Sequence, residues 1–126
     1  MSNKIKTLSP SKILAETIVK GMQELKGIEI KVLDLSNISG AVCQYFVICH
    51  GESDTQVMAI ARAIEKETLK QIKEKPWHTE GEGNAQWILM DYVDVVAHVF
   101  YKEAREFYNL EGLWADAPIE NIEFQL

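Results

Sequence analysis

The chain has 126 residues, of which 47% are hydrophobic and 25% charged, a composition typical of a single globular domain with its own core. Thirteen basic residues against nineteen acidic ones give a net charge of −6, which disfavours direct nucleic-acid binding because such binding depends on cationic contacts with phosphate. No apolar run approaches the roughly 20 residues that span a bilayer, and the N-terminus has no apolar stretch of signal-peptide type, so we expect a cytoplasmic protein.

The surplus of acidic residues also bears on the kind of partner the protein could have. An acidic surface is suited to a basic protein, because complementary charge steers the encounter and fixes its orientation. The alternative is that the negative charge only maintains solubility. The charge balance alone leaves both interpretations open.

The first half of the chain predicts a helix followed by two strands. Ser9 and Pro10 are typical of a helix start, and Gly27 marks the end of the periodic apolar pattern that follows them. Apolar and charged residues alternate over 28–35, which indicates a strand with one face partly solvated. The apolar run Tyr45–Cys49 has no such alternation and predicts a central strand covered on both faces.

The second half begins with a helix and a hairpin. Ser53 and Gln56 form a capping-box pattern for a helix that runs to about Lys75, and a polar loop follows. The apolar runs 87–90 and 95–100 flank a short turn and fit two strands. The strand-helix-strand segment 45–90 then implies a parallel pair of strands within a mixed sheet.

One helix is expected after the hairpin. Good helix formers begin at Lys102 and lead into apolar residues at mixed three-to-four spacing, which are expected to be core rather than a ligand cage: Phe107, Tyr108, Leu110, Leu113 and Trp114. The element order is helix-strand-strand-helix-strand-strand-helix, so we expect an α/β fold with a mixed β-sheet packed with helices. A single domain spans 1–126 with its core at about 10–118, and the tail 119–126 has no assigned element and is expected to be frayed or disordered.

The first hairpin strand offers a candidate binding surface. Trp87, Leu89 and Asp91 share one side of this strand, while Ile88 and Met90 share the other. If Ile88 and Met90 pack under helices, the first set forms an exposed apolar patch beside a carboxylate, as protein-binding hot spots do. The alternative is that Trp87 is simply buried.

Three residues could carry chemistry instead. Asp91 and Asp94 could hold a divalent cation, although aspartate is also typical of tight turns, where its side chain bonds nearby amides. His98 lies within the second hairpin strand, and a lone histidine there is more often a core-edge residue bonded through one ring nitrogen than a catalyst. The structural interpretation is favoured for all three.

The segment from Trp87 to Ala117 resembles the signature of the ribosomal silencing factor family, also called the Iojap family. That pattern reads roughly W, three apolar residues, DYGD, VVVHVF, then E-x-R-x-FY-x-LE-x-LW-x-DA, and the similarity extends over about residues 10 to 118. The residues that carry it here include Trp87, Asp91, Tyr92, Asp94, His98, Phe100, Glu103, Arg105, Phe107, Tyr108, Glu111 and Trp114. Val93 stands where the family usually has glycine, and Gln44 where it usually has aspartate.

The resemblance implies a nucleotidyltransferase-like topology and a non-enzymatic function without cofactor or metal. It implies binding to the large ribosomal subunit through ribosomal protein L-fourteen, steric block of small-subunit joining, and repression of translation. The expected partner-binding residues are Trp87, Leu89, Asp91, Tyr92 and Asp94, and the family resemblance also allows a homodimer in isolation. The alternative is a magnesium-dependent nucleotidyltransferase-like enzyme that uses the two aspartates.

Overall fold

The protein is built around one six-stranded mixed sheet, seen in a computed structural model that describes residues 9–123. The sheet order is β3-β4-β5-β2-β1-β6. Within the described residues no helix is both long and apolar enough to cross a membrane. In chain order the elements are α1 Pro10–Glu24, β1 Ile28–Asp34, β2 Tyr45–Gly51, α2 Asp54–Ile72, β3 His78–Glu80, β4 Trp87–Asp91, β5 Val95–Tyr101, α3 Lys102–Tyr108, α4 Leu110–Leu113 and β6 Ile119–Asn121.

The predicted mixed sheet is confirmed, but its parallel pair is not the expected one. Strand β2 runs parallel to β5, with Tyr45 opposite Val95 and Gly51 opposite Tyr101. Strand β4 instead pairs antiparallel with the other side of β5. The prediction from segment 45–90 was therefore wrong, because the chain first passes through the outer strands β3 and β4 and only then enters the centre of the sheet.

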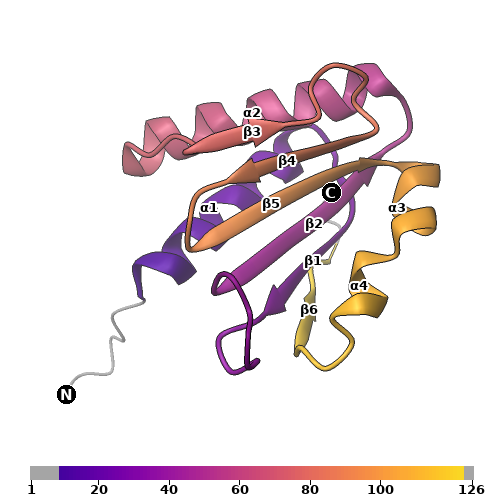
Figure 1. Ribbon diagram of the computed structural model, residues 1–126. Coiled ribbons are helices and arrows are strands. Elements are labelled where there is room, and N and C mark those ends of the chain that lie inside the picture. The colour runs from indigo at the N-terminus through magenta and orange to yellow at the C-terminus, as the bar shows by residue number, and fades with distance from the viewer. Residues whose placement is uncertain (1–8, 124–126) are drawn as a thin grey trace.

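Helices α1 and α2 cover one face of the sheet, the far face in Figure 1. Each begins with a serine cap, Ser9 and Ser53, whose side chain accepts a backbone hydrogen bond as the sequence predicted. The two helices approach closely at Gly21, where an added Cβ would lie 2.6 Å from the Cα of Ile64. A side chain at position 21 would therefore force the two backbones apart.

The opposite face is covered only in part. Helices α3 and α4 lie at one end of the sheet, and no helix of the described residues lies over the near face of β3 and β4 (Figure 1). The single helix predicted here is two short ones, because Asn109 adopts a left-handed conformation with φ 48° and both ends α3 and caps α4. Asparagine tolerates this conformation better than most residues.

Two short strands were absent from the sequence prediction. Strand β3 lies in the segment expected to be a polar loop, and it pairs with β4 at the edge of the sheet. Strand β6 lies in the segment expected to be a frayed tail, and it pairs with β1 at the other edge. Each has three residues, too few for a recognisable alternating pattern. The end of the predicted tail, 124–126, lies outside the described residues.

The turn between β4 and β5 places a β-branched residue in a backbone conformation that favours glycine. Val93 has φ 78°, and the backbone N–H of Asp94 donates to the carbonyl oxygen of Tyr92 at 3.0 Å, which closes a three-residue turn. The Asp91 carboxylate supports the turn by accepting from the Val93 N–H at 2.7 Å. Val93 therefore adopts a strained conformation at the position where the family pattern has glycine.

We predict that Val93→Gly stabilises the protein. Strain at a positive φ costs on the order of 1–3 kcal/mol, and the extra freedom of glycine in the unfolded chain offsets roughly 0.5–1 kcal/mol of the relief. The net gain of about 1 kcal/mol should raise the melting temperature by about 4 °C. Val42→Gly is the matched control, because Val42 is also highly exposed but has no positive φ. A Val93→Gly protein no more stable than the control would contradict the strain.

Candidate docking surface

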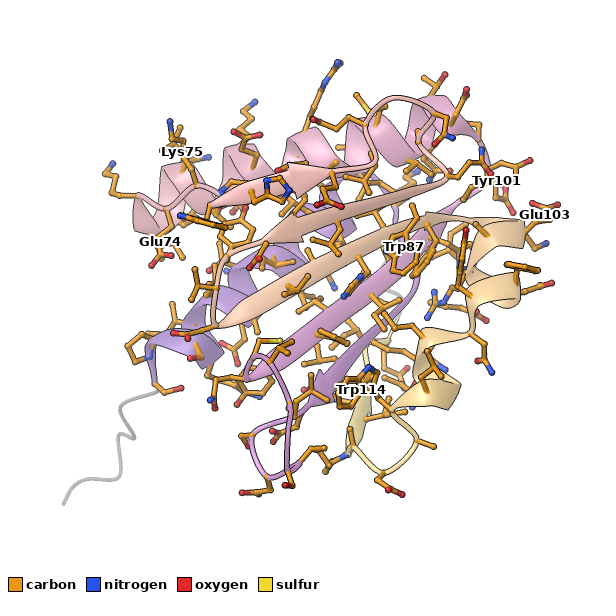
Figure 2. All side chains as sticks on the ribbon, in the orientation of Figure 1. Glu74, Lys75, Trp87, Tyr101, Glu103 and Trp114 are labelled. Atoms are coloured by element: carbon orange, nitrogen blue, oxygen red, sulfur yellow. The ribbon has the colours of Figure 1, made fainter. Side chains whose placement is uncertain are left out.

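The side chains of β4 divide between the two faces of the sheet as their alternation predicts. Ile88 and Met90 are fully buried under α1 and α2. Trp87, Leu89 and Asp91 are partly exposed on the other face. Figure 2 shows Trp87 in front of the sheet, beside the end occupied by α3. Because Ile88 and Met90 pack under the helices, Trp87 and Leu89 form a partly exposed apolar patch on the opposite face.

Trp87 is neither free on the surface nor buried in the core. Its indole stacks on Phe100 with ring centroids 5.0 Å apart, and the Tyr108 ring lies 4.8 Å away. Its Nε1–H donates to Nδ1 of His98 at 3.1 Å. Removal of this indole would leave a cavity as well as remove an exposed contact, so Trp87→Ala tests folding and binding at once.

The apolar surface continues past Leu89 to the hairpin turn. A hollow of about 360 Å³ lies beside this turn. A separate hollow of about 390 Å³ lies at Arg105, away from the strip. The turn hollow is lined by Val42, Trp77, Asp91, Val93 and Val96. Trp77 and Val42 are each 78% exposed. Trp77 is not among the residues predicted from the sequence, because it lies beside a polar stretch that predicts a loop, although an isolated tryptophan after Pro76 is a usable signal.

Tyr92 does not lie on this surface, which corrects one of the five expected partner-binding residues. Its side chain packs with Ile88 and Met90 on the helix-covered face and is only 6% exposed. Its hydroxyl shares a buried hydrogen bond with the Thr68 hydroxyl at 2.9 Å, and burial raises the pKa of Tyr92 to about 12. Tyr92 continues the alternation of Ile88 and Met90, which places its side chain inside.

Three residues of the aromatic helix segment were wrongly expected in the core. Phe107 is 80% exposed, Leu113 75% and Tyr108 47%. Phe107 lies on the side of α3 opposite the buried Arg105, and Leu113 follows the break at Asn109. Leu110 is buried and Trp114 packs partly on the core, as expected. Phe107 and Tyr108 contact each other edge to face at 5.1 Å, so the aromatic surface extends from Trp87 onto α3.

A buried arginine fixes α3 and α4 to the sheet. The Arg105 guanidinium donates to the Glu111 carboxylate at 2.8 and 3.1 Å, to the Ile28 carbonyl oxygen at 3.1 Å and to Nδ1 of His50 at 2.9 Å. Burial acts to raise the pKa of the Glu111 carboxyl, but the Arg105 hydrogen bonds and charge outweigh it and lower that pKa. These contacts form a largely buried network that joins α3 and α4 to β1 and β2.

The two aspartates differ in their roles. Asp91 uses one carboxylate oxygen in the turn, as the turn interpretation expected, whereas the Asp94 side chain is exposed. Among residues 9–123 no group of three or more His, Cys, Asp or Glu side chains is placed to hold a metal ion. In the loop after β2, the backbone N–H of Glu52 already donates to the Gln56 side chain at 2.9 Å, so this N–H is not free to bind a phosphate.

His98 is a buried, neutral residue of the central strand. It is 3% exposed, and burial lowers its pKa to about 3. The Phe46 ring contacts it edge to face at 4.5 Å, and its Nδ1 accepts the Trp87 indole N–H. The structure agrees with the interpretation of a core residue bonded through one ring nitrogen.

We predict that His98 makes the fold sensitive to mild acid. In the unfolded chain His98 has a pKa of about 6.5 and is protonated below that pH, whereas in the folded protein its pKa is about 3. Between these two values only the unfolded chain binds the proton, so the free energy of unfolding falls as pH falls. The difference in free energy of unfolding between wild type and His98→Asn should shrink by about 2 kcal/mol from pH 7 to pH 5. Urea titrations at several pH values measure it. Parallel curves for the two proteins would contradict the lowered pKa.

Comparison with known proteins identifies the family. Residues 8–125 match the family model described as "Ribosomal silencing factor during starvation". The chain is 48% identical over 99 residues to the ribosomal silencing factor of Bacillus subtilis, covering 76% of this chain and 80% of that protein. It is 40% identical over 110 residues to that of Halalkalibacterium halodurans, covering 87% and 92%.

A solved structure agrees with the fold. A crystal structure of a protein from Chromobacterium violaceum is similar with a TM-score of 0.79 at 26% identity, and the match covers 94% of each chain. The family model spans nearly the whole sequence, including the sheet face described above. The chain therefore belongs to the ribosomal silencing factor family.

Proposed function

We propose that the protein binds the large ribosomal subunit through ribosomal protein L-fourteen and blocks joining of the small subunit, which lowers translation in the cytoplasm. The observation that carries this proposal is the apolar strip of Trp87 and Leu89, bordered by Asp91 and Asp94, on a sheet face that the helices of residues 9–123 cover only in part. Membership of the ribosomal silencing factor family supports the same function.

The chemistry of the strip fits a basic protein partner. Half-buried aromatic residues are preferred anchors of protein interfaces because their position is fixed before the partner arrives. The exposed carboxylate of Asp94 and the net charge of −6 attract basic groups and orient them. The exposed Trp77 and Phe107 enlarge the apolar surface on either side of the strip.

Occlusion requires no chemical step. A folded domain bound at the joining surface of the large subunit occupies space that the small subunit needs. The function therefore depends on affinity and on the placement of the domain, and both come from the docking surface. This is consistent with a protein whose candidate catalytic aspartate is engaged in a turn.

The rival function is a magnesium-dependent nucleotidyltransferase-like enzyme. Isothermal titration with magnesium and ATP tests it, using wild type and the double variant Asp91→Ala, Asp94→Ala. Binding that the double variant loses would favour the enzyme. The occlusion proposal expects no such binding, since the backbone N–H of Glu52 before α2 is already bonded to the Gln56 side chain and the Asp91 carboxylate is engaged in the hairpin turn.

A homodimer in isolation is compatible with occlusion if the docking surface also mediates self-association. Sedimentation equilibrium of wild type and Leu89→Ser tests this arrangement. Dimers lost in the variant would place the dimer interface on the docking surface. Dimers retained in the variant would place that interface elsewhere on the molecule.

We predict that Leu89→Ser weakens binding to the large subunit by about tenfold or more, because the loss of one buried leucine contact at an interface is worth roughly 1.5–3 kcal/mol. Co-sedimentation with separated subunits measures binding, and a subunit-joining assay on the same gradients measures the block. Leu69→Ser is the matched control, because Leu69 is exposed on α2, on the other side of the sheet. Equal binding by both variants would exclude the β4 strip as the docking surface.

We predict that Asp94→Lys weakens binding about tenfold at 50 mM salt and only about threefold at 300 mM, since salt screens exposed charges. Asp94 is a better choice than Asp91, whose replacement would also disrupt the turn. Glu65→Lys, at an exposed position of α2, makes the same change of charge on the other face. The electrostatic contribution would be rejected if the two charge reversals had the same effect across the salt series.

A further inference from the structure

His98 is a buried polar residue whose presence the sheet alone does not explain. It stands in the middle of β5, opposite Leu89 of β4 and Ile48 of β2. All of its aromatic neighbours are rings without proton-transfer chemistry: Phe46 at 4.5 Å, Trp87 at 5.9 Å and Phe100 at 6.3 Å between centroids. A catalytic role finds no chemical partner in these contacts.

The hydrogen bonds of His98 show that the residue lowers the stability of the fold. Its Nδ1 accepts the Trp87 indole N–H, so in the neutral ring the proton lies on Nε2. Within residues 9–123 that Nε2 is the one fully buried side-chain nitrogen or oxygen without a hydrogen-bond partner. An unsatisfied buried donor lowers stability, and an aliphatic residue at this position would not carry that cost.

In return, His98 provides the indole of Trp87 with a fixed acceptor. Trp87 is held at its N–H by His98, along its face by Phe100 and at its side by Tyr108. These three contacts define one orientation of a side chain that is otherwise partly exposed. An anchor already ordered in the free protein loses less conformational entropy on binding.

We propose that His98 is a positioning residue that holds Trp87 in its docking orientation, so that the partner meets the carbon surface of the indole and not its N–H donor. The inference rests on the proposed function, because it concerns the same surface. The group of the partner that contacts Trp87 is then one that packs against the carbon atoms of the indole, such as an aliphatic chain or the flat face of a guanidinium. A carbonyl or carboxylate acceptor finds the indole N–H already engaged.

Two substitutions separate the acceptor from the bulk of the side chain. His98→Asn retains an oxygen near the position of Nδ1, whereas His98→Leu fills similar space without any acceptor. The first readout is made on the free protein, from the three tryptophan indole N–H resonances after ¹⁵N labelling, with that of Trp87 assigned through Trp87→Phe. We expect indole hydrogen exchange at Trp87 to stay slow in His98→Asn and to become at least about tenfold faster in His98→Leu, because the bond that protects it is lost.

The second readout is affinity for the large ribosomal subunit. His98→Leu should bind about threefold to tenfold more weakly than wild type, the cost of ordering one large side chain, and His98→Asn should bind within about twofold of wild type. In a Trp87→Phe background, which lacks the indole N–H, His98→Leu should cause no further loss. A loss that persists in that background would overturn the positioning role.

Thermal melting of each variant accompanies both readouts. If His98→Leu fails to fold, His98→Gln, whose amide reaches the Nε2 position instead, replaces it in every comparison with His98→Asn. Wild-type protein that binds no subunit would overturn the proposed function whatever the exchange rates. Normal wild-type binding together with unchanged Trp87 exchange in His98→Leu would overturn the positioning role alone.

Discussion

Strand β5 is hydrogen-bonded along both edges and buried on both faces, and the other elements are arranged by that constraint. Every residue from Val95 to Phe100 is buried. The strand pairs with β2 in parallel and with β4 antiparallel, and its apolar side chains on both faces require layers on both sides of the sheet. Helices α1 and α2 supply a complete layer on one side. On the other side, the short helices and the aromatic side chains around His98 supply an incomplete one, which leaves the docking surface.

The same constraint explains why polar groups near β5 are so fully engaged. The guanidinium of Arg105 satisfies groups from β1, β2 and α4 at the end of the sheet. If Arg105 were removed, the Glu111 carboxylate would lose its partner in a partly buried site, and only apolar contacts such as those of Leu110 and Trp114 would hold α3 and α4 to the sheet. The aromatic surface beside Trp87 therefore depends on a charge network about one helical turn away along the chain.

Much of the fold could be predicted from the sequence, because its signals are local. The serine caps of α1 and α2 and the strand alternation at Ile88 and Met90 need no knowledge of the rest of the chain. The parallel partner of β2 could not be predicted in this way, since β4 and β5 are both apolar and only the tertiary order of strands distinguishes them. Strands β3 and β6 are formed by pairing with neighbours rather than by their own pattern.

The candidate surface was predicted less completely for a related reason. Trp87, Leu89 and Asp91 followed from strand period, and the same period puts Tyr92 with Ile88 and Met90 on the helix-covered face. Only the family resemblance placed Tyr92 on the docking surface. The exposure of Leu113 follows the left-handed backbone of Asn109, which the helical spacing of its neighbours conceals. Apolar side chains at helical spacing indicate a buried face only while the helix is continuous.

The lengths of the outer strands limit the ways in which this sheet can recognise another chain. Strands β3 and β6 form its two edges with three residues each. Edges this short present few unpaired backbone groups, so an extended peptide finds little to add to, and sheets from separate molecules find little to join. Contact with another protein is thereby directed to side chains on the open face, where sequence rather than backbone decides which partner fits.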